Sequence, residues 1–63
     1  MIHLSSYFSE DDKRNAEVFH IEDFNQRPYQ CRVFTTDDWG ATSKDFIHIS
    51  EAEEFAENFV LNA

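Results

Sequence analysis

The chain has 63 residues and a formal net charge of −8 at pH 7, because 13 Asp and Glu residues stand against 5 Lys and Arg residues. A chain of this length forms at most one domain, residues 1–63, and its single cysteine, Cys31, excludes a disulfide within the chain. The acidic balance, without a cluster of Lys and Arg, argues against direct binding to nucleic acid and to anionic membranes, and it favours a basic protein partner.

The start of the chain lacks the basic segment and apolar run of a secretory signal, and no apolar run approaches the roughly 18 residues of a membrane span. We therefore expect a soluble, cytoplasmic protein. Cys31 fits a reducing compartment, and its strand-like surroundings favour a small buried side chain over a nucleophile. Disorder is disfavoured because the chain holds seven Phe, two Tyr and one Trp, in periodic runs.

The opening residues 2–8 (IHLSSYF) favour an edge strand, although Ser5 and Ser6 weaken its alternation. Residues 9–15 read as a polar loop. The sequence therefore leaves open whether this first strand joins the sheet.

A second strand is predicted over residues 16–23 (AEVFHIED), with Val18 on one face and Phe19 on the other. Residues 24–28 (FNQRP) form a connection, in which Pro28 favours an extended conformation of the residue before it. The alternation alone does not decide which of the two faces is buried.

The clearest strand covers residues 29–36 (YQCRVFTT), which are rich in aromatic and β-branched side chains. Residues 37–44 (DDWGATSK) are expected to turn the chain, because Gly40 can supply a positive φ. The last strand is predicted over residues 45–49 (DFIHI).

A helix is predicted from Ser50 onward. Ser50 and Glu53 have the spacing of a capping box, and acidic residues fill the first turn, where they favour the helix dipole. An amphipathic stripe follows the helical period. Its residues are Ala52, Phe55, Ala56, Phe59 and Val60.

This order of elements predicts an α+β fold: a three- to four-stranded antiparallel β-meander with one C-terminal α-helix packed on one face. Phe55 and Phe59 are expected to fill the core between helix and sheet. Their expected partners are Val33, Ile47, Ile49 and either Val18 or Phe19.

One helix covers one face of a sheet, so large apolar side chains remain on the other face. If the helix covers the face of Cys31, Val33 and Ile47, Phe34 and Phe46 point away from it, and Val18 joins them if the second strand turns its other face to the helix. Three outcomes stay open: the first strand and loops cover these rings, a second copy covers them in a homodimer, or a different protein does. The residues expected to contact a partner are Arg32, Phe34, Trp39 and Phe46.

Catalytic, metal-binding and cofactor-binding residues are not expected. The spacing of His3, Cys31 and the other two histidines matches no compact zinc pattern. The chain has no G-x-S-x-G motif, and its single glycine leaves no phosphate-binding loop.

These patterns favour a non-catalytic, acidic protein-binding or regulatory module. The alternative is an acidic inhibitor that imitates nucleic acid and occupies a basic nucleic-acid-binding protein, which requires carboxylates in two rows at phosphate spacing. Charge that keeps a Phe-rich chain soluble accounts for the same residues. The carboxylates concerned are Glu10, Asp11, Asp12, Asp37, Asp38, Glu53, Glu54 and Glu57.

Overall fold

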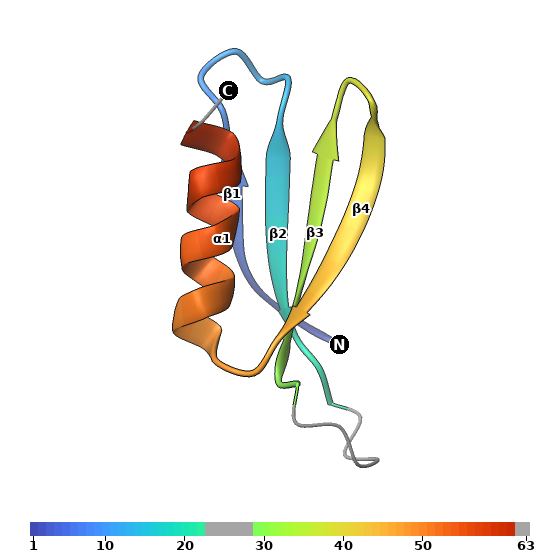
Figure 1. Ribbon diagram of the computed structural model, residues 1–63, viewed down its shortest axis with the longest axis vertical. Coiled ribbons are helices and arrows are strands. Elements are labelled where there is room, and N and C mark those ends of the chain that lie inside the picture. The colour runs from blue at the N-terminus through green and yellow to red at the C-terminus, as the bar shows by residue number, and fades with distance from the viewer. Residues whose placement is uncertain (23–28, 62–63) are drawn as a thin grey trace.

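The computed structural model describes residues 1–22 and 29–61, which form one open sheet with a helix packed against it (Figure 1). The elements are β1 (Ile2–Phe8), β2 (Asn15–His20), β3 (Cys31–Asp37), β4 (Gly40–Phe46) and α1 (Ile49–Leu61). The strands lie in chain order and each pairs antiparallel with the next. The predicted α+β meander with one C-terminal helix is therefore confirmed. The predicted connection at 24–28 lies outside the described residues.

The first strand joins the sheet as an edge strand, so the question left open by its sequence is resolved. β1 pairs with β2 along its length, but the register shifts between His3 and Ser5, which leaves Leu4 as an extra residue. Such a bulge bends and twists an edge strand, and it reduces the regular row of backbone groups that a further strand could pair with.

The hairpin between β3 and β4 differs from the predicted turn at 37–44. Asp37 pairs with Gly40, so only Asp38 and Trp39 connect the two strands. The Asp37 carboxylate accepts the Trp39 backbone N–H at 2.8 Å, and Gly40 has a φ of 136°, which a glycine adopts without strain. The polar run after Gly40 is therefore an edge strand and not a loop.

The chain leaves the sheet at Phe46, so the predicted strand at 45–49 is wrong in position. Ile47 and Ile49 are 41% and 45% exposed and lie outside the core. The helix begins at Ile49, where the His48 carbonyl accepts the Ala52 N–H at 3.2 Å.

Among residues 1–22 and 29–61, no hydrogen bond joins Ser50 to Glu53, so the predicted capping box does not form. The Glu53 carboxylate instead accepts a long hydrogen bond, 3.5 Å, from the Tyr7 hydroxyl of β1. Glu53 therefore links the helix to the sheet, whereas Glu51 remains in the first turn, where its charge favours the helix dipole.

The core lies between α1 and the inner face of the sheet. From the predicted stripe, Ala52, Ala56 and Val60 are buried, while Phe55 and Phe59 are half-buried at its margins. The buried partners on the strands are Ala16, Val18, Cys31 and Val33. The small helix residues let α1 lie close to the sheet, and each buried valine contributes about 1.5 kcal/mol. The core is consequently thin, since its largest fully buried side chains are Val18, Val33 and Cys31.

Candidate protein-binding face

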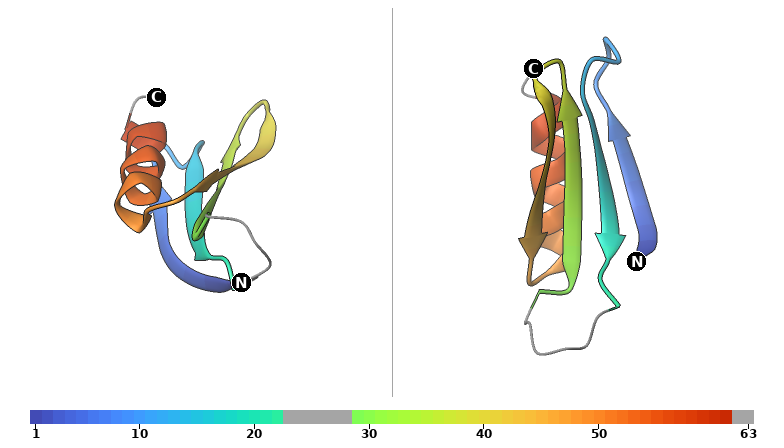
Figure 2. Two further views of the ribbon diagram at one scale, coloured as in Figure 1. Left: turned by 60° about the horizontal axis from the view of Figure 1, so that its bottom comes forward. Right: turned by 90° about the vertical axis from the view of Figure 1, so that its right-hand side faces the viewer.

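The face of the sheet opposite α1 carries three rows of side chains, because residues paired across neighbouring strands point to the same side. The rows are His3, Phe19, Arg32 and Asp45; Ser6, Glu17, Phe34 and Ser43; and Phe8, Asn15, Thr36 and Ala41. In the right-hand view of Figure 2, β3 and β4 lie in front of α1 while β2 and β1 continue the sheet beside them, and no other described helix or strand covers this face. We call these residues the open face.

Three aromatic rings run diagonally across the open face. The Phe19 ring centre lies 5.1 Å from that of His3, at an interplanar angle of 64°. It lies 5.4 Å from that of Phe34, at 84°. Edge-to-face pairs of this kind contribute about 0.5–1.5 kcal/mol each beyond their burial. The rings therefore hold one another in place while Phe19 and Phe34 remain only half-buried.

An ion pair flanks these rings. Arg32 Nε donates to Asp45 Oδ1 at 2.6 Å, and Nη2 donates to Oδ2 at 3.1 Å. The hydrogen bonds and the negative charge of Asp45 raise the pKa of Arg32 further above its ordinary value. The two side chains are 33% and 23% exposed, so the pair is partly screened from water and its charges are matched within the face.

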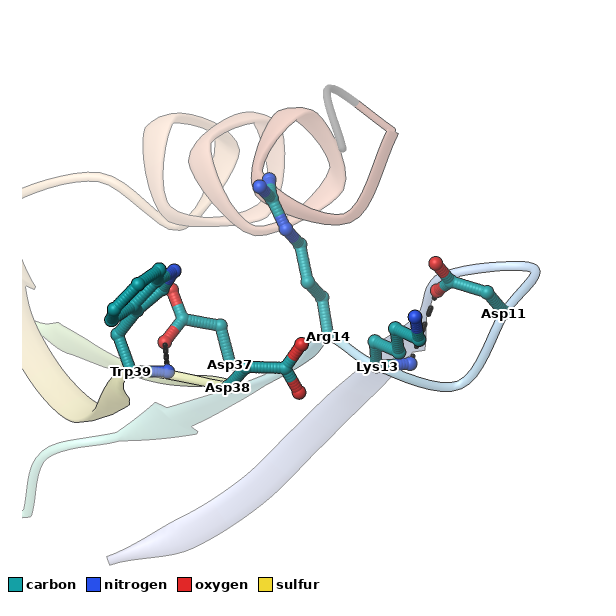
Figure 3. Close-up of a pocket in the computed structure, with 6 residues that line it drawn as sticks. All are labelled: Asp11, Lys13, Arg14, Asp37, Asp38 and Trp39. Carbon is teal, nitrogen blue, oxygen red and sulfur yellow. Dashed lines mark hydrogen bonds between the residues drawn. The ribbon is translucent and has the colours of Figure 1, made fainter.

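Trp39 lies at the tip of the β3–β4 hairpin, outside the three rows, and is 95% exposed. Its ring stands beside Asp37 at a shallow pocket of about 170 Å³ (Figure 3). Typical small-molecule sites enclose about 300–1,000 Å³. The pocket is lined by Asp11, Lys13, Arg14, Asp37, Asp38 and Trp39. It is smaller than such sites, and Trp39 projects from it as a free ring.

Phe46 lies on the helix side of the sheet, contrary to the prediction that it faces away with Phe34. It pairs with buried Cys31, and its ring centre lies 5.2 Å from that of Phe55 in α1. Lys44 Nζ covers both rings, at 5.4 Å and 5.2 Å from their centres. The prediction was wrong because it placed Ile47 on the same face as Cys31. In the observed register of the hairpin, Phe46 is the residue that pairs with Cys31.

Of the residues predicted to contact a partner, the open face therefore brings together Arg32 and Phe34, while Trp39 stands at the hairpin tip and Phe46 belongs to the core margin. His3 and Phe19 also lie on this face, although neither was among the residues predicted to contact a partner. A signal for Phe19 exists in its strand: Ala16 and Val18 alternate as small apolar residues suited to close helix packing, which assigns Phe19 to the other side.

Most of the excess of carboxylates over basic side chains lies outside the open face. Glu51, Glu54 and Glu57 are exposed on α1, and further carboxylates occupy the β1–β2 connection and the β3–β4 hairpin. The open face holds two carboxylates, Glu17 and Asp45, against the guanidinium of Arg32. It therefore accounts for one of the eight net negative charges of the chain.

No family model, curated protein or solved structure matches the chain. Within residues 1–22 and 29–61, no group of three His, Cys, Asp or Glu residues lies where it could hold a metal ion. In the same ranges, no helix has both the length and the apolar character to span a bilayer.

Proposed function

We propose that this chain is a non-catalytic binding or regulatory module of the cytoplasm, and that it contacts a protein partner through the open face. The observation that carries the proposal is the cluster of edge-to-face rings of His3, Phe19 and Phe34 on a sheet face that α1 leaves uncovered. The Phe19 and Phe34 rings stay partly exposed on this face, and apolar groups gathered on an uncovered surface mark candidate interaction sites in soluble proteins. The free thiol of Cys31 suits a reducing compartment.

The geometry of the rings supports binding because they are ordered before a partner arrives. Each ring is fixed by an edge-to-face neighbour, so little side-chain freedom is lost on association. Tryptophan, tyrosine and arginine most often dominate binding energy at interfaces, and Trp39 and Arg32 are residues of these types.

Arg32 and Trp39 complete the surface in different ways. Arg32 is already paired with Asp45 in a two-bond arrangement, so a partner that covers it does not leave an unmatched charge behind. Trp39 extends beyond the sheet and offers a large apolar ring at the rim of the face.

Capture experiments with a tagged protein in lysate of the native host test this proposal. Phe34→Ser removes one ring of this cluster, and Leu61→Ser is a matched control because Leu61 is an exposed apolar residue at the end of α1. We expect the wild type and the control to retain a protein when salt is raised, and Phe34→Ser to lose it. Equal capture by all three proteins would refute the role of the open face, and a steep loss with salt for the wild type would favour the nucleic-acid-mimicking alternative.

A folding test accompanies the capture. Phe34→Ser and Trp39→Ser should both keep the far-UV circular dichroism of the wild type, because neither side chain belongs to the core between α1 and the sheet. If both substitutions unfold the protein, these rings are part of its stability and not of a recognition surface.

A further inference from the structure

We propose that the partner on the open face is a second copy of this chain, so that two sheets pack face to face in a symmetric dimer. The inference rests on the proposed function, since it uses the same surface. In a two-fold symmetric dimer the same patch on both copies meets itself, and the patch must therefore complement itself in shape and charge.

The charge distribution favours this face for self-association. The open face contributes only Glu17 beyond the matched Arg32–Asp45 pair, although each chain carries a net charge of −8. Packing the open faces together places the exposed carboxylates of α1 on the two outer sides of the dimer, where water separates them. A dimer formed through α1 would instead bring these carboxylates together.

The edges of the sheet are less suited to self-association than its face. On β1 the register shift at Leu4 interrupts the regular ladder that a further strand would extend. On β4, Lys44 places its charge over the Phe46 and Phe55 rings next to the strand edge. Bulges and edge lysines are the devices by which sheets avoid pairing edge to edge.

The dimensions of the face set the expected strength of the dimer. A seven-residue strand spans about 23 Å, and four strands cover about 19 Å, which gives roughly 440 Å² per copy in projection. Two copies then bury on the order of 900 Å², which is below the range of stable interfaces and within that of weak, transient ones. We therefore expect a concentration-dependent dimer with a dissociation constant in the micromolar range, on the order of 1–100 µM.

A dimer of this kind also supplies what the monomer lacks. The core under α1 has no fully buried side chain larger than valine among the described residues. Face-to-face packing adds a second apolar layer made from Phe19 and Phe34 of both copies, and short chains commonly gain stability from a second subunit.

Sedimentation equilibrium of the purified wild-type chain, from roughly 1 µM to 1 mM, tests the proposal directly. We expect the average mass to rise from that of one chain to that of two. Phe19→Ser and Phe34→Ser should each weaken the dimer by about tenfold or more, as expected for central aromatic residues. Leu61→Ser, which removes an exposed apolar side chain outside the face, should leave the dissociation constant unchanged.

Arg32→Glu provides a second variant that does not remove a ring. It replaces the one cationic partner on the face by a carboxylate, so the two copies repel each other there. We expect a weaker dimer at low salt that partly recovers as salt is raised, whereas Lys13→Glu, at an exposed position outside the face, should have a smaller effect.

A wild-type chain that stays folded and monomeric up to about 1 mM would overturn the dimer. If capture from lysate still depended on Phe34, the proposed function would stand with a different partner. A dimer unaffected by Phe19→Ser, Phe34→Ser and Arg32→Glu would also overturn the proposal, because it would be built on another surface.

Discussion

Arg14 reaches from the connection between β1 and β2 to the C-terminal end of α1, where its Nη1 donates to the Phe59 carbonyl at 3.1 Å. Its guanidinium carbon also lies 5.4 Å from the centre of the Phe59 ring, and Figure 3 shows the side chain rising toward the helix. The last turn of α1 has no basic residue of its own. Arg14 therefore supplies the positive charge that favours a helix C-terminus.

We expect Arg14→Gln to lower the free energy of unfolding by about 1–2 kcal/mol, because it removes a charged hydrogen bond, a contact with an aromatic ring and a cation near the end of α1. Urea titration followed by circular dichroism measures the loss. Lys13→Gln makes the same change in charge at the exposed neighbouring residue and should stay within about 0.5 kcal/mol of the wild type. Equal losses in the two variants would show that overall charge, and not this contact, is responsible.

Ala56 is fully buried in the core between α1 and the sheet. Ala56→Leu adds three carbon atoms at this place, and we expect the strain of overpacking to lower the free energy of unfolding by about 1–3 kcal/mol. Asn58→Leu places the same side chain at an exposed position of the helix and serves as the control. A thermal melt of both variants decides, and unchanged stability of Ala56→Leu would mean that the helix can move away from the sheet at little cost.

The Cys31 thiol should be inert in the folded protein. Burial, and then the nearby charge of Glu53, raise the pKa of Cys31, so the reactive thiolate is scarce. We expect a thiol reagent at pH 8 to label the native chain far more slowly than the chain in urea, which mass spectrometry measures at this single cysteine. Because the pKa of Cys31 is higher in the folded state, its contribution to the free energy of unfolding should be fully present below the ordinary thiol pKa. That contribution should be lost as the pH rises through the folded-state pKa. Rapid labelling of the native chain would contradict the buried position.

Asp11 should make the free energy of unfolding depend on pH in the acidic range. Its Oδ1 accepts the Ser9 hydroxyl at 2.7 Å and the Lys13 N–H at 3.1 Å, and these hydrogen bonds lower the pKa of Asp11 below its ordinary value of 3.8. A carboxyl whose pKa is lowered by folding stabilises the protein above its ordinary pKa and loses that effect as pH falls through the folded-state pKa.

Asp11→Asn should therefore lose less stability than the wild type as the pH is lowered below about 4, as measured by urea midpoints at successive pH values. Glu10→Gln removes a carboxylate from the same connection without touching these hydrogen bonds, and it is the matched control. The same acid dependence in Asp11→Asn and the wild type would show that the Ser9 and Lys13 contacts do not matter for folding.

The elements that bury a regular pattern of side chains could be predicted from the sequence. α1 has a strict helical stripe, and β3 alternates large and β-branched residues, since both elements pack on the core. β4 could not be placed in the same way. It is an edge strand whose residues from Gly40 to Lys44 are all exposed, so no burial imposes alternation on them. The neighbouring Ile47 and Ile49 are apolar but not buried. Their alternation led to a strand being predicted at residues 45–49, after the true position of β4.

The candidate face was predicted only in part for a related reason. Arg32 and Phe34 alternate with Cys31 and Val33 inside one strand, so their common side follows from local sequence. The side of Phe46 depends on how β4 pairs with β3, and a shift of one residue moves every side chain to the other face. That register is set by the two-residue connection Asp38–Trp39, which the sequence pattern did not locate.

The helix that covers the core follows all four strands in the chain. The segment that shields Val18 and Val33 is therefore synthesised after all four strands. Until α1 packs on the strands, the inner face of the sheet exposes Val18 and Val33, and exposed apolar side chains of this kind favour aggregation. A chain that ends before Ile49 would consequently leave Val18 and Val33 exposed and should aggregate more readily than the full chain.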